Sequence, residues 1–299
     1  MSPTARCNAC QAPVDPERDL AWVKDGFEIL RCRSCGLLFR ADLPSPEELP
    51  RLYGGAYFRS EEHSEGGQGY ADYVAEEELH RLNARRRLSL LEGSLRPGRL
   101  LDVGCAAGFF LDEARQRGWS VTGVEVSAEM ASWASEQVGI DDVIRGLFTA
   151  HEWPEAAFDC VTMWDYIEHT IDPVFELRLA QRILRPGGFL ALSTGDAGSL
   201  AARASGRRWH LLTPRHHNYF FTRGSLSLAL ERAGFTVLAV RYLGARYSMR
   251  YLVHKLRTFS DLRALRRLER GLSASRLGSA AVPLNLRDIV TVVARGKKT

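Results

Sequence analysis

The chain has 299 residues, of which 45% are hydrophobic and 25% charged, and its formal net charge is +4 at pH 7. These values exclude a disordered chain, a collagen-like repeat and a disulfide-rich miniprotein, and they are typical of a globular protein. At this length we expect one α/β domain of about 200 residues and a small additional module. No run of about 18 apolar residues occurs, and the first residues lack the apolar stretch of a secretory signal. We therefore expect a cytoplasmic protein.

The first pattern along the chain is formed by four of the six cysteines. Cys7 and Cys10 form one Cys-x-x-Cys pair, Cys32 and Cys35 form another, and 21 residues separate the pairs. Two such turns can place four thiolates about 2.3 Å from one tetrahedral ion, so we expect a zinc-ribbon-like module over residues 1–45. Four sulfur ligands leave no position for water or substrate, which predicts a structural zinc. The alternatives are two disulfide bonds, which are uncommon in a cytoplasmic protein, or four reduced thiols without a metal.

The charge of this module bears on its partner. Residues 1–40 carry 6 basic and 5 acidic side chains, which is too little positive charge for a module that must neutralise phosphates. The pattern argues against nucleic acid as the partner.

The remainder of the chain divides into a linker and helical lead-in over residues 46–96 and a larger domain over residues 97–299. Alternating elements in the larger domain predict a Rossmann-like, doubly wound, mostly parallel seven-stranded sheet covered by helices. Two longer segments interrupt the alternation, a lid-like insertion over 195–222 and a basic helical insertion over 242–286. The expected strands are 99–104, 120–125, 142–145, 158–164, 187–193, 235–241 and 287–295, and the expected helices are 108–117, 128–138, 173–184 and 224–233.

The first strand of the larger domain runs into a turn with the spacing Gly104-x-x-x-Gly108. The dinucleotide fingerprint G-x-G-x-x-G is absent, because Ala106 occupies the position of its second glycine. Asp102 adds negative charge that disfavours a phosphate and favours a cationic ligand. Glu125 follows 23 residues later at the end of the second strand, where an acid can accept hydrogen bonds from both hydroxyls of a ribose. Together these residues predict a nucleoside ligand without phosphates.

With the later turn over residues 184–188, this order of motifs resembles the class I S-adenosylmethionine-dependent methyltransferases over roughly 97–241 and the final strand. The resemblance implies S-adenosylmethionine as the cofactor. It places Asp102, Gly104 and Gly108 at the methionine and ribose part, Glu125 at the ribose hydroxyls, and Leu147 or Phe148 beside the adenine. The full set of cofactor-binding residues that we expect is Asp102, Gly104, Gly108, Glu125, Leu147, Phe148 and Trp164.

The fourth strand ends before Asp165, and the segment after it contains the dipeptide Glu168-His169. It resembles the acidic and histidine-containing segment of the quinone-biosynthesis O-methyltransferases. Methyl transfer from a sulfonium is an in-line displacement, so the protein must align the acceptor and remove the proton of an acceptor hydroxyl. Three roles stay open: His169 is the general base, or Asp165, Glu168 and His169 bind a divalent cation that lowers the pKa of the acceptor hydroxyl, or the segment is structural.

Residues 209–222 are rich in histidine and aromatic side chains, and we expect them to cover the active site. His216 and His217 are candidate acceptor contacts or bases, and a further metal ligand from this segment is conceivable. The alternative is an aromatic lid with solvated histidines.

Charge is distributed unevenly along the chain. Residues 241–299 carry 14 lysines and arginines against 3 acidic residues, a net charge of +11 that leaves −7 for residues 1–240. An amphipathic basic helix in this region can lie on an anionic membrane surface, although a helix packed on its own domain gives the same pattern. The apolar positions are Leu252, Leu256, Phe259, Leu262 and Leu265, with Lys255, Arg257, Arg263, Arg266, Arg267 and Arg270 between them.

These observations predict a methyltransferase that acts by direct methyl displacement on a hydroxyl of a small molecule, such as a sugar, a glycolipid or a secondary metabolite. An RNA base methyltransferase and a non-catalytic nucleoside-binding scaffold are the alternatives. The RNA alternative is weakened because residues 164–167 read Trp-Asp-Tyr-Ile, where amino-group methylases of bases commonly have Asn/Asp-Pro-Pro-aromatic. No motif specifies an oligomeric state.

Overall fold

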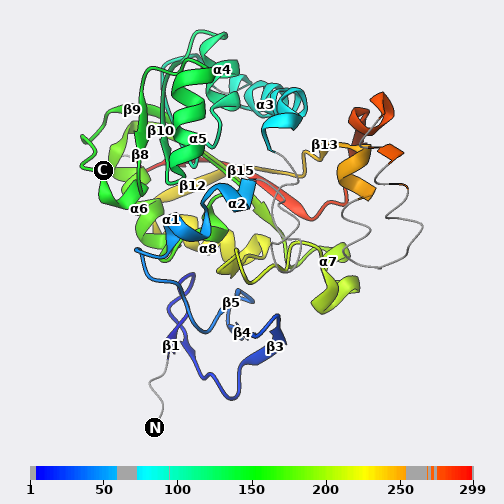
Figure 1. Ribbon diagram of the computed structural model, residues 1–299. Helices are drawn as coiled ribbons and strands as arrows, with labels where there is room; N and C mark the ends of the chain where they lie inside the picture. Colours follow the sequence, from blue (N-terminus) through cyan, green and yellow to red (C-terminus); the bar gives the residue numbers. More distant parts are fainter. Residues whose placement is uncertain are drawn as a thin grey trace.

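The computed structural model describes residues 5–58, 73–93, 95–253, 268, 271–272 and 275–297 (Figure 1). Most of the basic insertion expected within 242–286 lies outside the described residues, and so does most of the amphipathic helix expected there. Within the described part of the chain, no helix combines the length and apolarity needed to cross a membrane.

A seven-stranded sheet forms the centre of the molecule, as the sequence predicts, with strand order β12-β15-β10-β9-β6-β7-β8. The five strands from β10 to β8 are parallel to one another, and β15 runs antiparallel to both β10 and β12. The chain moves outward through β7 and β8 on one side of β6 and through β9 and β10 on the other. The carboxyl ends of β6 and β9 therefore flank the switch point at which such sheets bind ligands. The strands are β6 (Arg99–Val103), β7 (Ser120–Glu125), β8 (Val143–Arg145), β9 (Phe158–Trp164), β10 (Leu184–Gly195), β12 (Phe235–Arg241) and β15 (Ile289–Gly296).

Helices cover both faces of this sheet, because its central strands are apolar on both sides. One apolar core joins α3 and α4 to the sheet through Leu88, Leu91 and Leu111. The opposite core joins α6 and α8 through Leu177 and Leu230, both fully buried. The helices are α3 (Glu77–Glu92), α4 (Phe109–Arg115), α5 (Ala128–Ser132) with a π-helical turn over Trp133–Gln137, α6 (Pro173–Ile183) and α8 (Arg223–Arg232).

The N-terminal module lies at one end of the molecule (Figure 1) and contains a four-stranded sheet of order β11-β5-β4-β3 beside the β1-β2 pair. Strand β11 comes from the expected lid segment and pairs antiparallel with β5, with Tyr219 opposite Phe39. The module thus shares a sheet with a segment that lies about 180 residues further along the chain. Its strands are β1 (Ala5–Arg6), β2 (Pro13–Val14), β3 (Leu20–Lys24), β4 (Phe27–Arg31), β5 (Leu38–Arg40) and β11 (Tyr219–Phe220).

Short elements fill the segments between the module and the large sheet and complete the chain. The lead-in holds α1, α2 and η1 before α3, the lid segment holds α7 and η5, and the region before β15 forms the hairpin β13-β14. Their bounds are α1 (Leu49–Leu52), α2 (Gly55–Phe58), η1 (Val74–Glu76), η3 (Phe148–Ala150), η4 (Ile167–His169), α7 (Leu200–Ser205), η5 (Gly206–Arg208), β13 (Ala245–Ser248), η6 (Arg276–Ser279) and β14 (Ala281–Leu284).

Candidate active site

A cavity of about 490 Å³ opens at the carboxyl ends of β6 and β9. Four separate stretches of the chain line it: the lead-in, the ends of the central strands, the segment over residues 210–217, and the region around β13. Of the residues expected in the site, those lining the cavity are Asp102, Gly104, Glu125, Leu147, Phe148, Trp164, Asp165, Glu168, His169 and His216.

The glycine turn forms one wall of this cavity. Gly104 has a φ of 74°, and a Cβ atom there would lie 2.7 Å from the ring of Tyr166, so both conformation and space require glycine. Asp102 is 3% exposed, and its Oδ1 accepts a hydrogen bond of 2.6 Å from the Thr162 hydroxyl. Burial raises the pKa of Asp102 to about 7. A buried carboxyl group without a cationic partner resists ionisation, and a positively charged ligand would remove that resistance.

Gly108 is placed differently from Gly104. It lies outside the cavity lining, has a φ of 79° and precedes the first turn of α4. A Cβ atom there would lie 2.9 Å from the Cβ of Ala134. The structure thus gives Gly108 a role in the packing of helix against helix, instead of the cofactor contact expected from the motif.

Glu125 ends β7 at the rim of the glycine turn. One carboxylate oxygen accepts a hydrogen bond from the Ala106 N–H at 2.9 Å, and the other accepts one from the Ser127 N–H at 2.7 Å. Burial raises its pKa although these two backbone donors favour the charged form. The two bonds fix the carboxylate while each oxygen keeps a second lone pair for a ligand hydroxyl.

The acidic-histidine loop, defined here as residues 165–172, begins where β9 ends. Asp165 has a φ of 52°, accepts a hydrogen bond from the Ser193 hydroxyl and forms an ion pair with Arg87 of α3 at 2.7 Å. Asp165 therefore pairs with a helix of the lead-in. The structure does not gather Asp165, Glu168 and His169 as a metal-binding set, which corrects that expectation.

The ligand atoms that do come together belong to Glu168, His169 and His217, and all lie within 4.8 Å of one another. Glu168 is 4% exposed, and its Oε2 has no hydrogen-bond partner among the described residues. Burial, together with the nearby Asp165 carboxylate, raises the pKa of Glu168 to about 8. An unpartnered carboxyl oxygen beside two imidazoles is an acceptor for a proton, a ligand hydroxyl or a cation.

The two imidazoles in this group share one arrangement. The Nδ1 atom of His169 lies 2.9 Å from the carbonyl oxygen of His216, and the Nδ1 atom of His217 lies 3.0 Å from that of Leu211. A carbonyl oxygen only accepts, so each Nδ1 carries the proton and each Nε2 keeps a lone pair. The Tyr53 hydroxyl also donates to the His216 carbonyl, at 2.6 Å. Burial lowers the pKa of His169 to about 4, so this ring is neutral at pH 7.

Comparison with known proteins identifies the family. The model of the methyltransferase domain family matches residues 75–240, more than half of the chain. The malonyl-[acyl-carrier protein] O-methyltransferase of Enterobacter lignolyticus is 32% identical over 196 residues, which cover 62% of this chain and 75% of that protein. The chain is an S-adenosylmethionine-dependent methyltransferase.

Further similarities agree with this family. The ubiquinone biosynthesis O-methyltransferase of Paracidovorax citrulli is 33% identical over 125 residues, or 39% of this chain, and the match spans about half (52%) of that relative's length. Solved structures of S-adenosylmethionine-dependent methyltransferases from Thermotoga maritima and Archaeoglobus fulgidus share the fold. Each has a TM-score of 0.50 and covers 75% of this chain, with 22% and 18% identity over 95% and 98% of their own chains.

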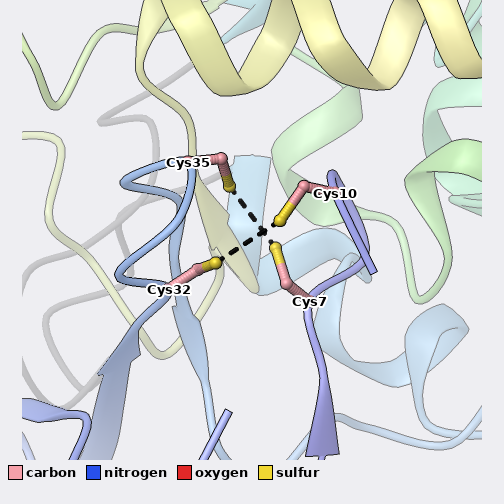
Figure 2. Close-up of side chains that lie close together, drawn as sticks. All are labelled: Cys7, Cys10, Cys32 and Cys35. Carbon is pink, nitrogen blue, oxygen red and sulfur yellow. Dashed lines mark hydrogen bonds between the residues drawn. The ribbon is translucent and has the colours of Figure 1, made fainter. Parts of the chain in front are cut away.

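The N-terminal cysteines of the methyltransferase converge on one point (Figure 2). All four sulfur atoms lie within 4.8 Å of one another, and the pairs Cys7–Cys35 and Cys10–Cys32 are 3.5 Å apart. Zinc–sulfur bonds of about 2.3 Å in a tetrahedron require sulfur atoms about 3.8 Å apart, so the cluster fits a zinc ion. The four thiols are free, which does not agree with the two-disulfide alternative.

The lead-in contributes to the methyltransferase cavity in a way that was not expected from the sequence. Tyr53, Tyr57, Tyr73 and His80 all line it, and the rings of Tyr73 and His80 stack with centroids 3.9 Å apart. Burial lowers the pKa of His80 to about 3, so its ring is neutral. The signal was the run of tyrosines and phenylalanine over residues 53–58, which is unusually aromatic for a linker.

His210 is another cavity residue that was not expected. Its Nε2 lies 2.8 Å from a carboxylate oxygen of the buried Asp288, which also accepts a hydrogen bond from Trp209. These contacts hold the start of the lid segment against β15.

Proposed function

We propose that the methyltransferase transfers the methyl group of S-adenosylmethionine to a hydroxyl oxygen of a small molecule. The observation that carries this proposal is the single cavity that contains both the acids at the ends of β6 and β7 and the Glu168, His169 and His217 group. A cofactor at the first position and an acceptor at the second would face each other within one enclosed space.

The proposed cofactor site uses the chemistry of its buried acids. Asp102 would face the positive charge of the methionine part, and the free lone pairs of Glu125 would accept hydrogen bonds from the ribose hydroxyls. Leu147, Phe148 and Trp164 supply apolar surface for the adenine and the methyl-bearing sulfur. Gly104 keeps the turn close to the ligand because no side chain intervenes.

The reaction requires alignment and the removal of one proton. The acceptor oxygen forms a bond to the methyl carbon while the carbon–sulfur bond breaks, and the electron pair stays on the sulfur of S-adenosylhomocysteine. The hydroxyl proton passes to a basic atom at the acceptor end, for which the proposal assigns the Nε2 lone pair of His169 or His217. Oxygen is favoured as the acceptor atom because the Enterobacter and Paracidovorax relatives are both named O-methyltransferases.

We also propose two metal sites with different tasks. A structural zinc ion would be held by Cys7, Cys10, Cys32 and Cys35, whose sulfur spacing supports it. A divalent cation would be held by Glu168, His169 and His217, where it would lower the pKa of an acceptor hydroxyl. Both imidazoles are fixed by carbonyl partners through Nδ1, which is the usual arrangement of metal-binding histidines.

The test begins with titration calorimetry using S-adenosylmethionine and S-adenosylhomocysteine, with metal content measured on the same sample. We expect micromolar binding of both nucleosides and one zinc per chain. Acceptors are then screened with methyl-labelled cofactor, using hydroxylated phenols, sugars and lipids in separate pools.

Variants locate the reaction. His217→Ala and Glu168→Gln should reduce methyl transfer at least ten-fold and leave cofactor affinity within about three-fold, because neither contacts the acids at β6 and β7. Arg185→Ala, at an exposed ion pair with Asp159 outside the cavity lining, is the control for both. Absence of binding by either nucleoside would contradict the proposal, as would equal activity of all three variants.

A further inference from the structure

Two adjacent residues at the start of β11 connect the cysteine module to the acidic-histidine loop. Asn218 and Tyr219 follow His217 directly in the chain. Between them they donate hydrogen bonds to four consecutive backbone carbonyls of the loop, those of residues 168–171.

Asn218 is 1% exposed and makes the larger share of these contacts. Its carboxamide nitrogen donates to the carbonyl oxygens of His169 and Thr170, each at 3.0 Å, and its backbone N–H donates to that of Glu168 at 2.8 Å. On the other side, the Arg40 guanidinium donates to the Asn218 side-chain oxygen at 3.4 Å, and the Arg40 N–H donates to the Asn218 carbonyl at 2.9 Å. The amide group thus has a partner in both parts of the protein.

Tyr219 makes a second connection through a different part of the module. Its hydroxyl donates to the Ile171 carbonyl at 2.6 Å and accepts a hydrogen bond from the Asn8 side chain at 2.5 Å. Asn8 lies between Cys7 and Cys10, whereas Arg40 ends the strand that follows Cys35. Each Cys-x-x-Cys turn is therefore connected to the loop by its own route.

We infer that Asn218 is a positioning residue through which the cysteine module fixes the backbone that carries Glu168 and His169. This inference rests on the proposed function, which assigns these two side chains to the acceptor end of the cavity. Backbone carbonyls in a buried loop need donors, and the loop obtains four of them from residues whose position is set by pairing with β5. The module therefore contributes to catalysis although no cysteine lines the cavity near the acceptor.

The test compares Asn218→Asp with Asn285→Asp in the full chain. The first change keeps the partner of Arg40 but removes both N–H donors and places an oxygen against the carbonyls of His169 and Thr170. The second makes the same chemical change at an exposed asparagine that donates to the Tyr242 carbonyl, outside the cavity lining. Hydrogen exchange of residues 165–172, the dissociation constant of S-adenosylmethionine and kcat with the acceptor from the screen are measured for each.

We expect Asn218→Asp to exchange at least ten-fold faster in the loop and to lower kcat at least ten-fold, with cofactor affinity within about three-fold. Asn285→Asp should match the unsubstituted protein in all three. Unchanged exchange in the loop, or equal acceleration over the whole chain, would overturn the inference. Exchange and cofactor affinity decide it even if no acceptor is found, so failure of the proposed function is recognised separately. If Asn218→Asp does not fold, Tyr219→Phe, which removes one hydroxyl, must show the same local acceleration around Ile171.

Discussion

Asp102 shows how one buried residue can make ligand binding depend on pH. The Thr162 hydroxyl is its only hydrogen-bond donor among the described contacts, which is too little to offset burial, so its pKa rises to about 7. A carboxyl group of this kind is neutral in part of the population at physiological pH. Only a cation brought beside it makes the ionised form favourable.

We expect the affinity for S-adenosylmethionine to increase as the pH rises from 6 to 8. A cationic ligand binds the ionised form of Asp102, so below the pKa of about 7 each lower pH unit should weaken binding up to about ten-fold. Calorimetry in two buffers of different ionisation enthalpy should show proton release near pH 6 and less near pH 8. Asp102→Asn should bind weakly at both pH values, and a retained pH dependence in that variant would assign the effect to another group.

Glu125 allows a second test at the scale of a residue. Glu125→Gln keeps the size of the side chain but gives one end to an amide nitrogen, which cannot accept from Ala106 or Ser127 or from a ribose hydroxyl. We expect the dissociation constant of S-adenosylmethionine to rise at least ten-fold. Glu129→Gln, on the neighbouring helix and outside the cavity lining, is the matched control. Equal affinity of the two variants would remove the ribose contact from Glu125.

At the scale of elements, the cysteine turns replace an apolar core that short strands cannot build. Strands β1 and β2 have two residues each, and only a bound ion would hold such short pieces together. Cys32→Ser should therefore release about one zinc per chain and lower the melting temperature by several degrees. Cys105→Ser, at a buried thiol outside the cluster, should keep the zinc. Metal analysis and thermal unfolding of both variants check this prediction, which retention of zinc in Cys32→Ser would contradict.

The regular elements of the large domain could be predicted because their signals are local. β7, β9 and β12 have the expected bounds, since each is an apolar run between turn residues. β10 begins at Leu184, earlier than expected, because a register shift lets the chain pair with β9 on both sides of the turn at Gly187 and Gly188. The expected helix over 128–138 is an α-helix followed by a π-helical turn, a change of hydrogen-bond pattern that periodicity does not reveal.

The site was predicted where a strand end carries it and not where tertiary packing brings it together. Asp102 and Glu125 lie at the expected edge of the sheet because parallel strands end together. The partner of Asp165 is Arg87, and its position depends on how α3 packs against the sheet. The pairing of β11 with β5 involves only two residues of each strand. So short a pairing leaves no alternation in the sequence from which it could be predicted.

At the scale of the whole molecule, burial of several acids makes the stability depend on pH. Burial raises the pKa of Asp102 and Glu176 to about 7 and that of Glu168 to about 8, all above the values of about 4 in an unfolded chain. Between those limits the folded protein holds protons that the unfolded chain has released, so stability falls as the pH rises. The buried His80 and His169 act oppositely, because their lowered pKa values weaken the fold only below about pH 6.5.

We therefore expect the free energy of unfolding, without cofactor or added metal, to fall between pH 6.5 and 8. Each acid that is protonated only in the folded state contributes about 1.4 kcal/mol per pH unit. Urea unfolding at the two pH values measures the difference. Glu168→Gln removes the group with the highest pKa of the three and should reduce the slope, and a stability that rises across this interval would contradict the assignment of buried, protonated acids.

The shared sheet also limits how this architecture can be recombined. Because β11 is the edge strand of the cysteine module and begins directly after His217, the wall of the acceptor pocket and the N-terminal module have complementary surfaces that must match. A chimaera that takes only residues 209–222 from a relative inherits a strand fitted to a foreign partner, whereas one that takes residues 1–45 as well keeps the pair intact. Segments at opposite ends of the gene should consequently evolve as one unit, and acceptor preference in this lineage should be inherited with the module that contains no acceptor-binding residue of its own.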